Sequence, residues 1–177
     1  SVMCTRLEQA FAKKLGVRFA VSFINGTATM HAALEAAGVG PGDEVIVPSL
    51  TMASTAFVAL QAHAVPVFAD IDPDTFQIEP GSIRERITPY TKAIIPVALY
   101  GLAPEMDEIM AIAREHNLVV IEDDAEAIGN TYKGRQIGTI GHMSSFSFQS
   151  SKHLTSGEGG MIVTDDEELA VKVRRFN

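Results

Sequence analysis

The stretch LVVIEDDAEAIGN, residues 118–130, joins an uninterrupted apolar run to a group of carboxylates, and it decides the class of fold. Residues 118–121 are apolar at consecutive positions and do not alternate with polar ones. Such a run is typical of a strand whose two faces are both covered by helices. The run ends at Glu122 and Asp123, so polar side chains follow directly after a buried strand. We therefore expect a parallel sheet with ligand-binding chemistry at its carboxyl edge.

Short apolar runs and helical segments alternate along the whole chain. Helical periodicity occurs in five segments: Val2 to Leu15, Thr27 to Ala37, Thr51 to Ala62, Glu105 to His116 and Glu167 to Phe176. Strand-type runs occupy seven others: residues 18–23, 44–48, 66–71, 92–99, 118–123, 143–148 and 160–164. The Pro- and Asp-rich stretch 70–80 is predicted to be a loop. The order predicts an α/β fold with a mostly parallel seven-stranded sheet sandwiched by helices.

The bulk composition bounds the class of protein. With 177 residues, 46% of them hydrophobic, the chain can bury a core, and its length favours one domain. A net charge of -8 disfavours nucleic acid or an anionic membrane as a partner. No apolar run approaches the roughly 20 residues that cross a bilayer, and no signal-peptide pattern is present, so we expect a cytoplasmic location. Cys4 is the single cysteine, which leaves no internal disulfide.

The two ends of the chain suggest a fragment. The first helical segment shows no capping residue, and the last helical pattern stops at Asn177. We therefore expect these 177 residues to belong to a longer protein.

Four groups of polar residues follow apolar runs, and the first is FINGTAT, residues 23–29. Here a strand passes through Asn25 and Gly26 into a helix opened by Thr27. The free N–H groups of a helix start bind phosphate, and Gly26 allows close approach to the backbone. A helix cap without a ligand explains the same residues, so both interpretations stay open.

The second group is the acidic cluster Glu122, Asp123, Asp124 and Glu126. A carboxylate at the end of a buried strand is costly unless it meets a cation or several donors, so we expect a positive partner for one of them. A solvated acidic loop or an acidic helix start is the alternative. A metal site is a further one, which the absence of nearby histidines disfavours.

The third group is SFSFQSSKHLTSGEGG, residues 145–160, in which Lys152 follows the strand residue Ser147. A lysine with a lowered pKa forms a Schiff base with a carbonyl compound, and serine hydroxyls beside it hold a phosphate. The glycines allow the backbone to come close. The alternative is a lysine on an exposed loop.

The fourth group is VPSLTMAST, residues 47–55, where we expect Ser49 or Thr51 to cap the following helix. The five histidines show no metal-type spacing, so no metal site is predicted.

Taken together and in this order, these motifs resemble the DegT/StrS type of sugar aminotransferases, which are pyridoxal 5′-phosphate (PLP) enzymes of the aspartate-aminotransferase fold. The resemblance runs from Leu7 to Asn177 and includes further stretches: GPGDEVIVPSLT, VPVFADIDPDTFQI and VALYGLAPEMDEI. It implies that residues 1–177 are the large PLP-binding domain, with an N-terminal lead-in and a small C-terminal domain missing from this chain.

The resemblance also implies catalytic roles. Lys152 matches the lysine that binds PLP as a Schiff base and then carries the proton between the α-carbon and C4′. Asp123 matches the carboxylate that keeps the pyridine nitrogen protonated. Gly26, Thr27 and Ala28 match the phosphate-binding turn at the helix start.

Three further cofactor contacts follow from the same resemblance. Ser147 matches a second donor to the phosphate, and Glu126 falls at the position near the 3′-oxygen of the cofactor. Met52 stands where many members place an aromatic ring over the pyridine, and it would cover the ring with a softer contact.

The implied reaction is transfer of an amino group from glutamate or glutamine to the keto group of a nucleotide-linked sugar, for surface polysaccharide or glycosylated metabolites. A homodimer with shared active sites is implied as well. The alternatives are a PLP-dependent sugar dehydratase, an eliminating enzyme on the same scaffold, and a PLP-binding regulator without catalysis. Dehydratases of this type carry histidine at the lysine position, whereas this chain carries Lys152.

Overall fold

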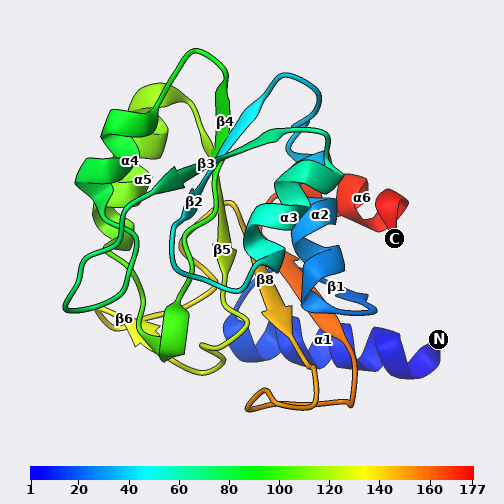
Figure 1. The fold of residues 1–177 in the computed structure, drawn as a ribbon. Coiled ribbons are helices and arrows are strands. Elements are labelled where there is room, and N and C mark those ends of the chain that lie inside the picture. The colour runs from blue at the N-terminus through cyan, green and yellow to red at the C-terminus, as the bar shows by residue number, and fades with distance from the viewer.

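The computed structural model describes residues 1–177, and its centre is one seven-stranded sheet in the order β1-β9-β8-β5-β4-β2-β3 (Figure 1). Its strands are β1 (Phe19–Phe23), β2 (Glu44–Pro48), β3 (Val65–Ala69), β4 (Thr91–Ile94), β5 (Val119–Asp123), β8 (Met143–Ser147) and β9 (Gly160–Thr164). Strand β9 is antiparallel to both of its neighbours, and all other pairs are parallel. The predicted α/β fold with a mostly parallel seven-stranded sheet is confirmed.

Helices cover both faces of this sheet (Figure 1). The helices are α1 (Val2–Leu15), α2 (Gly26–Ala36), α3 (Ser54–Gln61), α4 (Pro80–Arg86), α5 (Met106–His116) and α6 (Glu167–Phe176). One apolar core joins α2, α3 and α6 to one face, while two others join α4 with α5, and α1, to the opposite face. Strand β5 shows why its run is apolar throughout, because Val120 and Ile121 are both fully buried but in different cores. None of these helices combines the length and apolarity needed to cross a lipid bilayer.

Three short elements were not expected from the sequence. Helix α4 begins at Pro80, the last residue of the stretch 70–80 predicted to be a loop, and proline suits the first position of a helix. Strands β6 (Thr131–Tyr132) and β7 (Arg135–Gln136) form a hairpin whose turn residues Lys133 and Gly134 both have positive φ. A lysine in that position gives no hairpin signal, whereas asparagine or aspartate would have.

Two helix starts differ from expectation. Helix α1 does have a cap, because the Ser1 hydroxyl accepts a hydrogen bond from the Cys4 N–H. Helix α3 begins at Ser54, and its N-cap residue Ala53 has no capping side chain. The prediction that Ser49 or Thr51 caps this helix was therefore wrong; the Thr51 hydroxyl instead pairs with the hydroxyl of Thr55.

Candidate active site

A cavity of about 660 Å³ lies at the carboxyl ends of β1, β5 and β8, where a parallel sheet of this kind binds its ligands. Most of the residues singled out from the sequence line it together: Gly26, Thr27, Met52, Asp123, Glu126, Ser147 and Lys152. Ala28 is the exception among them. The cavity therefore joins the helix start, the acidic cluster and the lysine loop, which are far apart in the sequence.

The start of α2 presents free N–H groups to this cavity. Asn25 caps the helix, and its side chain accepts a hydrogen bond from the Ala28 N–H at 2.8 Å. This is why Ala28 differs from expectation, since its N–H group is already occupied by the cap. The Thr29 N–H donates to the Asn25 carbonyl oxygen, which leaves Gly26 and Thr27 as the cavity-lining residues of the first turn.

Close packing explains the glycines around this turn. A Cβ at Gly26 would lie 3.0 Å from the Ser147 Cβ, a tight contact against the neighbouring strand. A Cβ at Gly160 would lie 2.5 Å from the Asn25 carbonyl, which no side chain tolerates. Beneath the turn, the buried hydroxyls of Thr29 and Ser145 lie 2.5 Å apart, and both reach the Gly26 carbonyl oxygen. The backbone of the turn is thus held directly against β8.

Asp123 is the buried carboxylate of the cavity, at the end of β5 and only 4% exposed. Its Oδ2 accepts a hydrogen bond from the Thr55 hydroxyl at 2.9 Å, and its Oδ1 accepts from the Ala125 N–H at 3.3 Å. Burial raises its pKa, and these two donors together with the positive charge of Lys152 oppose that effect. Such a carboxylate is suited to a positively charged partner in the cavity.

Lys152 lies in the loop between β8 and β9, and its Nζ donates to Glu126 Oε1 at 3.1 Å. The other carboxylate oxygen of Glu126 accepts from the N–H of Tyr100, a residue with a left-handed backbone at φ 56°. Burial opposes the ionisation of Glu126, but the hydrogen bonds from Tyr100 and Lys152 outweigh it and lower its pKa. Within the acidic cluster, Glu126 is therefore the carboxylate that has a positive partner in the chain, and that partner is Lys152.

The remaining two acids of the cluster are turned away from the cavity. Glu122 accepts hydrogen bonds from three N–H groups, those of Gly138, Ile140 and Gly141. Asp124 accepts from the Ser144 hydroxyl at 2.5 Å. Burial raises the pKa of both groups, and Glu122 raises that of Asp124 further through its negative charge. Glu122 therefore holds the loop before β8 in place, and Asp124 bonds to β8 itself.

Two residues of the site were missed from the sequence. Thr55 contacts Asp123, and the signal for it was a threonine on the apolar side of a helix, four residues after Thr51. Tyr100 contacts Glu126 through its backbone alone, so no side-chain pattern could have identified it.

With this fold and cavity, the chain falls into the class of α/β proteins that bind a ligand at the carboxyl edge of the sheet. A family model matches residues 3–177, and the chain belongs to the DegT/DnrJ/EryC1/StrS aminotransferase family. The resemblance found in the sequence is thereby confirmed. This family is dependent on PLP.

Three relatives illustrate the similarity. The chain is 52% identical to the GDP-perosamine synthase of Caulobacter vibrioides, over 94% of this chain and 45% of that protein. It superposes on an aminotransferase from Psychrobacter cryohalolentis with a TM-score of 0.95 at 44% identity, covering 97% of this chain and 44% of the other. For NtdA from Bacillus subtilis, solved with the cofactor PMP, the TM-score is 0.92 at 38% identity, with 96% and 38% covered. The chain thus spans less than half the length of these relatives.

The residues present fit PLP. The start of α2 offers N–H groups to a phosphate, and a Cβ at Gly26 would fill the space beside Ser147. The buried carboxylate of Asp123 and the amine of Lys152 line the same cavity. A phosphate, a ring nitrogen and an aldehyde each have a matching group.

Proposed function

We propose that the protein transfers an amino group from an amino acid, glutamate or glutamine, to the keto group of a nucleotide-linked sugar, with PLP as cofactor. The observation that carries this proposal is that Lys152 and Asp123 line one cavity together with the start of α2. A lysine amine for the carbonyl group, a carboxylate for the ring and an anion site for the phosphate are the three elements that the chemistry needs. Residues 1–177 form the PLP-binding domain in this proposal.

The start of α2 holds the phosphate group. The N–H groups of Gly26 and Thr27 would donate to the phosphate at the positive end of the helix dipole, and the Ser147 hydroxyl would add a third donor from β8. Ala28 is left out of this role, because its N–H donates to Asn25. Binding of the phosphate fixes the position of the cofactor relative to β5 and β8.

Asp123 holds the proton on the pyridine nitrogen. When bound, PLP supplies an electron-withdrawing ring that accepts negative charge during the reaction, and protonation of its nitrogen strengthens this property. A buried carboxylate is effective here because its interaction with a positive charge is not weakened by water. Met52, which also lines the cavity, covers the face of the ring through its flexible side chain.

Lys152 binds the cofactor covalently and afterwards moves the proton. Without the cofactor its amine donates to Glu126, so the carboxylate holds Nζ inside the cavity, and the lysine side chain is only 17% exposed. Once the amino donor has displaced it, the free amine would move the proton from the α-carbon of the donor to C4′. Glu126 would then be free to bond to the 3′-oxygen of the cofactor.

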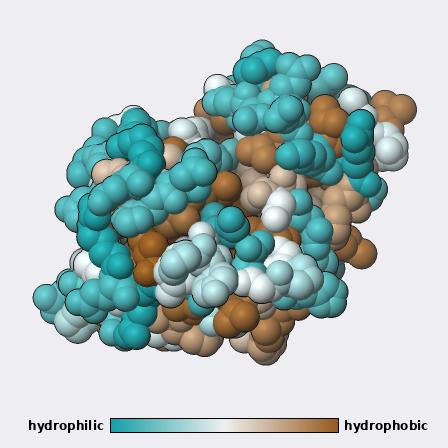
Figure 2. All heavy atoms as spheres, turned by 90° about the horizontal axis from the view of Figure 1, so that it is seen from above, coloured by the Kyte–Doolittle hydropathy of each residue, from teal (hydrophilic) through white to brown (hydrophobic).

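The whole protein works as a homodimer in this proposal. Figure 2 shows the face seen from above in Figure 1, where hydrophilic residues predominate and apolar ones are exposed between them, whereas the arrows of β5 and β8 point away from this face toward the cavity. Among the large apolar side chains, Met52, Phe57 and Tyr100 are 69%, 57% and 75% exposed, and the first two line the cavity. Exposed apolar side chains at the mouth of a cavity favour a protein partner, and a second copy would close the site. Sedimentation of the full-length protein tests the oligomeric state.

Borohydride labelling tests the function. The full-length protein should absorb at roughly 410 to 430 nm and lose this band on reduction, with the label on Lys152. Glutamate should shift the band to about 330 nm, a change that a dehydratase need not show. K152A should carry no label and lose about 10⁴-fold in rate, whereas the control K133A, which removes an exposed surface lysine, should behave as wild type. A colourless protein without label would refute the proposal.

A panel of nucleotide-linked keto sugars then tests the substrate class. Amino transfer to at least one of them, with glutamate or glutamine as donor, is the expected result. Each half-reaction should proceed alone, because both use the same site in turn.

A further inference from the structure

Two threonines, four residues apart at the start of α3, form a line of hydroxyls that ends on Asp123. The Thr51 and Thr55 Oγ1 atoms lie 3.1 Å apart, and Thr55 Oγ1 lies 2.9 Å from Asp123 Oδ2. Thr55 is fully buried, whereas Thr51 is half-buried and lines the cavity. The line therefore leads from the cavity wall to the buried carboxylate.

The chemistry of hydroxyls gives this line a direction. An ionised carboxylate only accepts hydrogen bonds, so Thr55 donates its single hydroxyl proton to Asp123. Thr55 can then only accept from Thr51, which donates. Both hydroxyl dipoles consequently point their positive ends toward Asp123, and bonds aligned in this way strengthen one another.

Neither hydroxyl is used to build the helix. Helix α3 has Ala53 as its N-cap and no side-chain cap, so the local backbone does not explain the two threonines. The contact joins residues 68 positions apart, from α3 to β5. A fully buried hydroxyl whose bond runs to a cavity-lining carboxylate is placed to act on that carboxylate.

We propose that Thr51 and Thr55 are positioning residues, a two-hydroxyl relay that keeps Asp123 ionised and aimed into the cavity to pair with the ring nitrogen of PLP. This inference rests on the proposed function, because it assigns Asp123 its partner. Thr55 makes the direct contact and Thr51 polarises it, so the effect of Thr55 is the larger.

The charges around Asp123 support this assignment. Burial raises the pKa of Asp123, and the Thr55 hydroxyl is the strongest of the groups that lower it. The Ala125 N–H and the positive charge of Lys152 also lower it, and the negative charge of Glu126 raises it. Asp124, the neighbouring carboxylate, faces Ser144 instead. Without the Thr55 hydroxyl, burial would dominate and Asp123 would take up a proton more readily.

The experiment measures the dissociation constant of PLP as a function of pH in the full-length protein and four variants. T55V keeps the shape but removes the hydroxyl, T55S restores it, and T51V removes the outer one. T131V is the matched control, because Thr131 is exposed, lies outside the lining of the cavity and takes no part in the line. Thermal unfolding of each apo-protein is measured beside it.

We expect T55V to weaken PLP binding about tenfold at neutral pH, as for loss of one hydrogen bond to a charged group. The pH below which binding is lost should rise by about one unit, because a carboxylate of higher pKa is neutralised earlier on acidification. T55S should restore both values. T51V should weaken PLP binding about two- to threefold, because the bond from Thr55 to Asp123 is less polarised, and T131V should match wild type.

Wild-type PLP affinity and an unchanged pH profile in T55V would overturn the relay, even with a lower unfolding temperature, since that pattern marks a purely structural role. Equal losses in T55V and T55S would overturn it as well. If T55V does not fold, T51V decides, and an unaltered pH profile in that variant rejects the relay. A wild-type protein that binds no PLP would instead refute the proposed function.

Discussion

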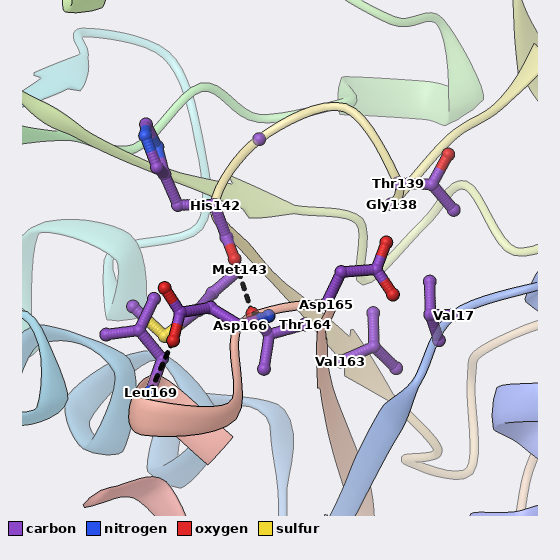
Figure 3. Close-up of a pocket in the computed structure, with 11 residues that line it drawn as sticks. Val17, Gly138, Thr139, His142, Met143, Val163, Thr164, Asp165, Asp166 and Leu169 are labelled. Carbon is purple, nitrogen blue, oxygen red and sulfur yellow. Dashed lines mark hydrogen bonds between the residues drawn. The ribbon is translucent and has the colours of Figure 1, made fainter.

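Acidic side chains lie at both edges of the sheet, but the two edges use them differently. At the carboxyl edge of the parallel strands, Asp123 is buried and lines a cavity of about 660 Å³. At the opposite edge, Asp165 and Asp166 follow β9 beside a cavity of about 180 Å³ (Figure 3). Both edges also carry threonines and glycines, so composition alone does not separate them.

The difference lies in what the carboxylates bind. Asp165 accepts a hydrogen bond from the Arg18 N–H at 2.7 Å, and Asp166 caps α6 by accepting from the Leu169 N–H, a contact marked in Figure 3. Both therefore serve the backbone. Asp123 is held by one side-chain hydroxyl and a long backbone contact, and it faces a cavity shared with Lys152. Asp123 is a candidate site residue because backbone N–H groups do not occupy all of its hydrogen-bonding capacity, whereas Asp165 and Asp166 bond to backbone N–H groups.

Replacing one carboxylate by the neutral asparagine at each edge of the sheet is the strongest test of this comparison. D123N should lower kcat of the full-length protein about 10³-fold, because the ring nitrogen loses a preorganised negative charge. D165N should leave kcat unchanged, since an asparagine oxygen can still accept from Arg18. Steady-state rates with glutamate measure both variants, and equal losses would show that the two edges do not differ in function.

Two glycine substitutions test whether the backbone at the carboxyl edge is needed for PLP binding. G26A should weaken PLP binding about tenfold, because the new Cβ would lie 3.0 Å from Ser147 and push the phosphate-binding turn away from β8. G40A is the matched control, since no atom lies within 4 Å of its Cβ. Fluorescence titration with PLP measures the two dissociation constants. Similar affinities in both variants would contradict the role of the turn.

The pH dependence of stability separates Asp124 from Glu126, the cavity acid whose pKa is lowered. Burial and the charge of Glu122 raise its pKa well above the ordinary 3.8. Below pH 3.8 both states are protonated; as pH rises, the unfolded state ionises first, so this group lowers stability until its folded pKa is reached. D124N removes the effect and should gain relative to wild type by up to about 1.4 kcal/mol per pH unit in that window. Urea unfolding at several pH values measures it, and a pH-independent difference would contradict it.

The smallest effect is expected at the opposite edge of the sheet. D166A removes the cap of α6 and should lower the free energy of unfolding by about 1 kcal/mol. PLP affinity should stay at the wild-type value, because the residue lies away from the cavity at the carboxyl edge. Chemical denaturation and PLP titration of the same preparation give both numbers. A loss of PLP binding would mean that the two edges are coupled.

Local patterns were sufficient to predict the sheet and several of the residues that line the cavity. Val120 and Ile121 are buried on opposite faces of β5, as the consecutive apolar residues 118–121 indicated, and Val119 is partly buried. The start of α2 and the loop of Lys152 were identified because polar residues follow an apolar run in each of them. Helix α3 was predicted to begin three residues early, because threonine is a common capping residue, whereas the Thr51 hydroxyl pairs with that of Thr55.

The sequence by itself determined the order of strands and helices along the chain, their apolar faces, and the residue types available at each strand end, because these depend on neighbours within a few positions. Only the tertiary structure decided which of those residues meet. Lys152 pairs with Glu126 across 26 positions and Thr55 with Asp123 across 68. Such contacts depend on the order of the strands within the sheet and on their register, which local periodicity does not encode. The tertiary structure also decides how deeply each carboxylate is buried, and burial shifts its pKa.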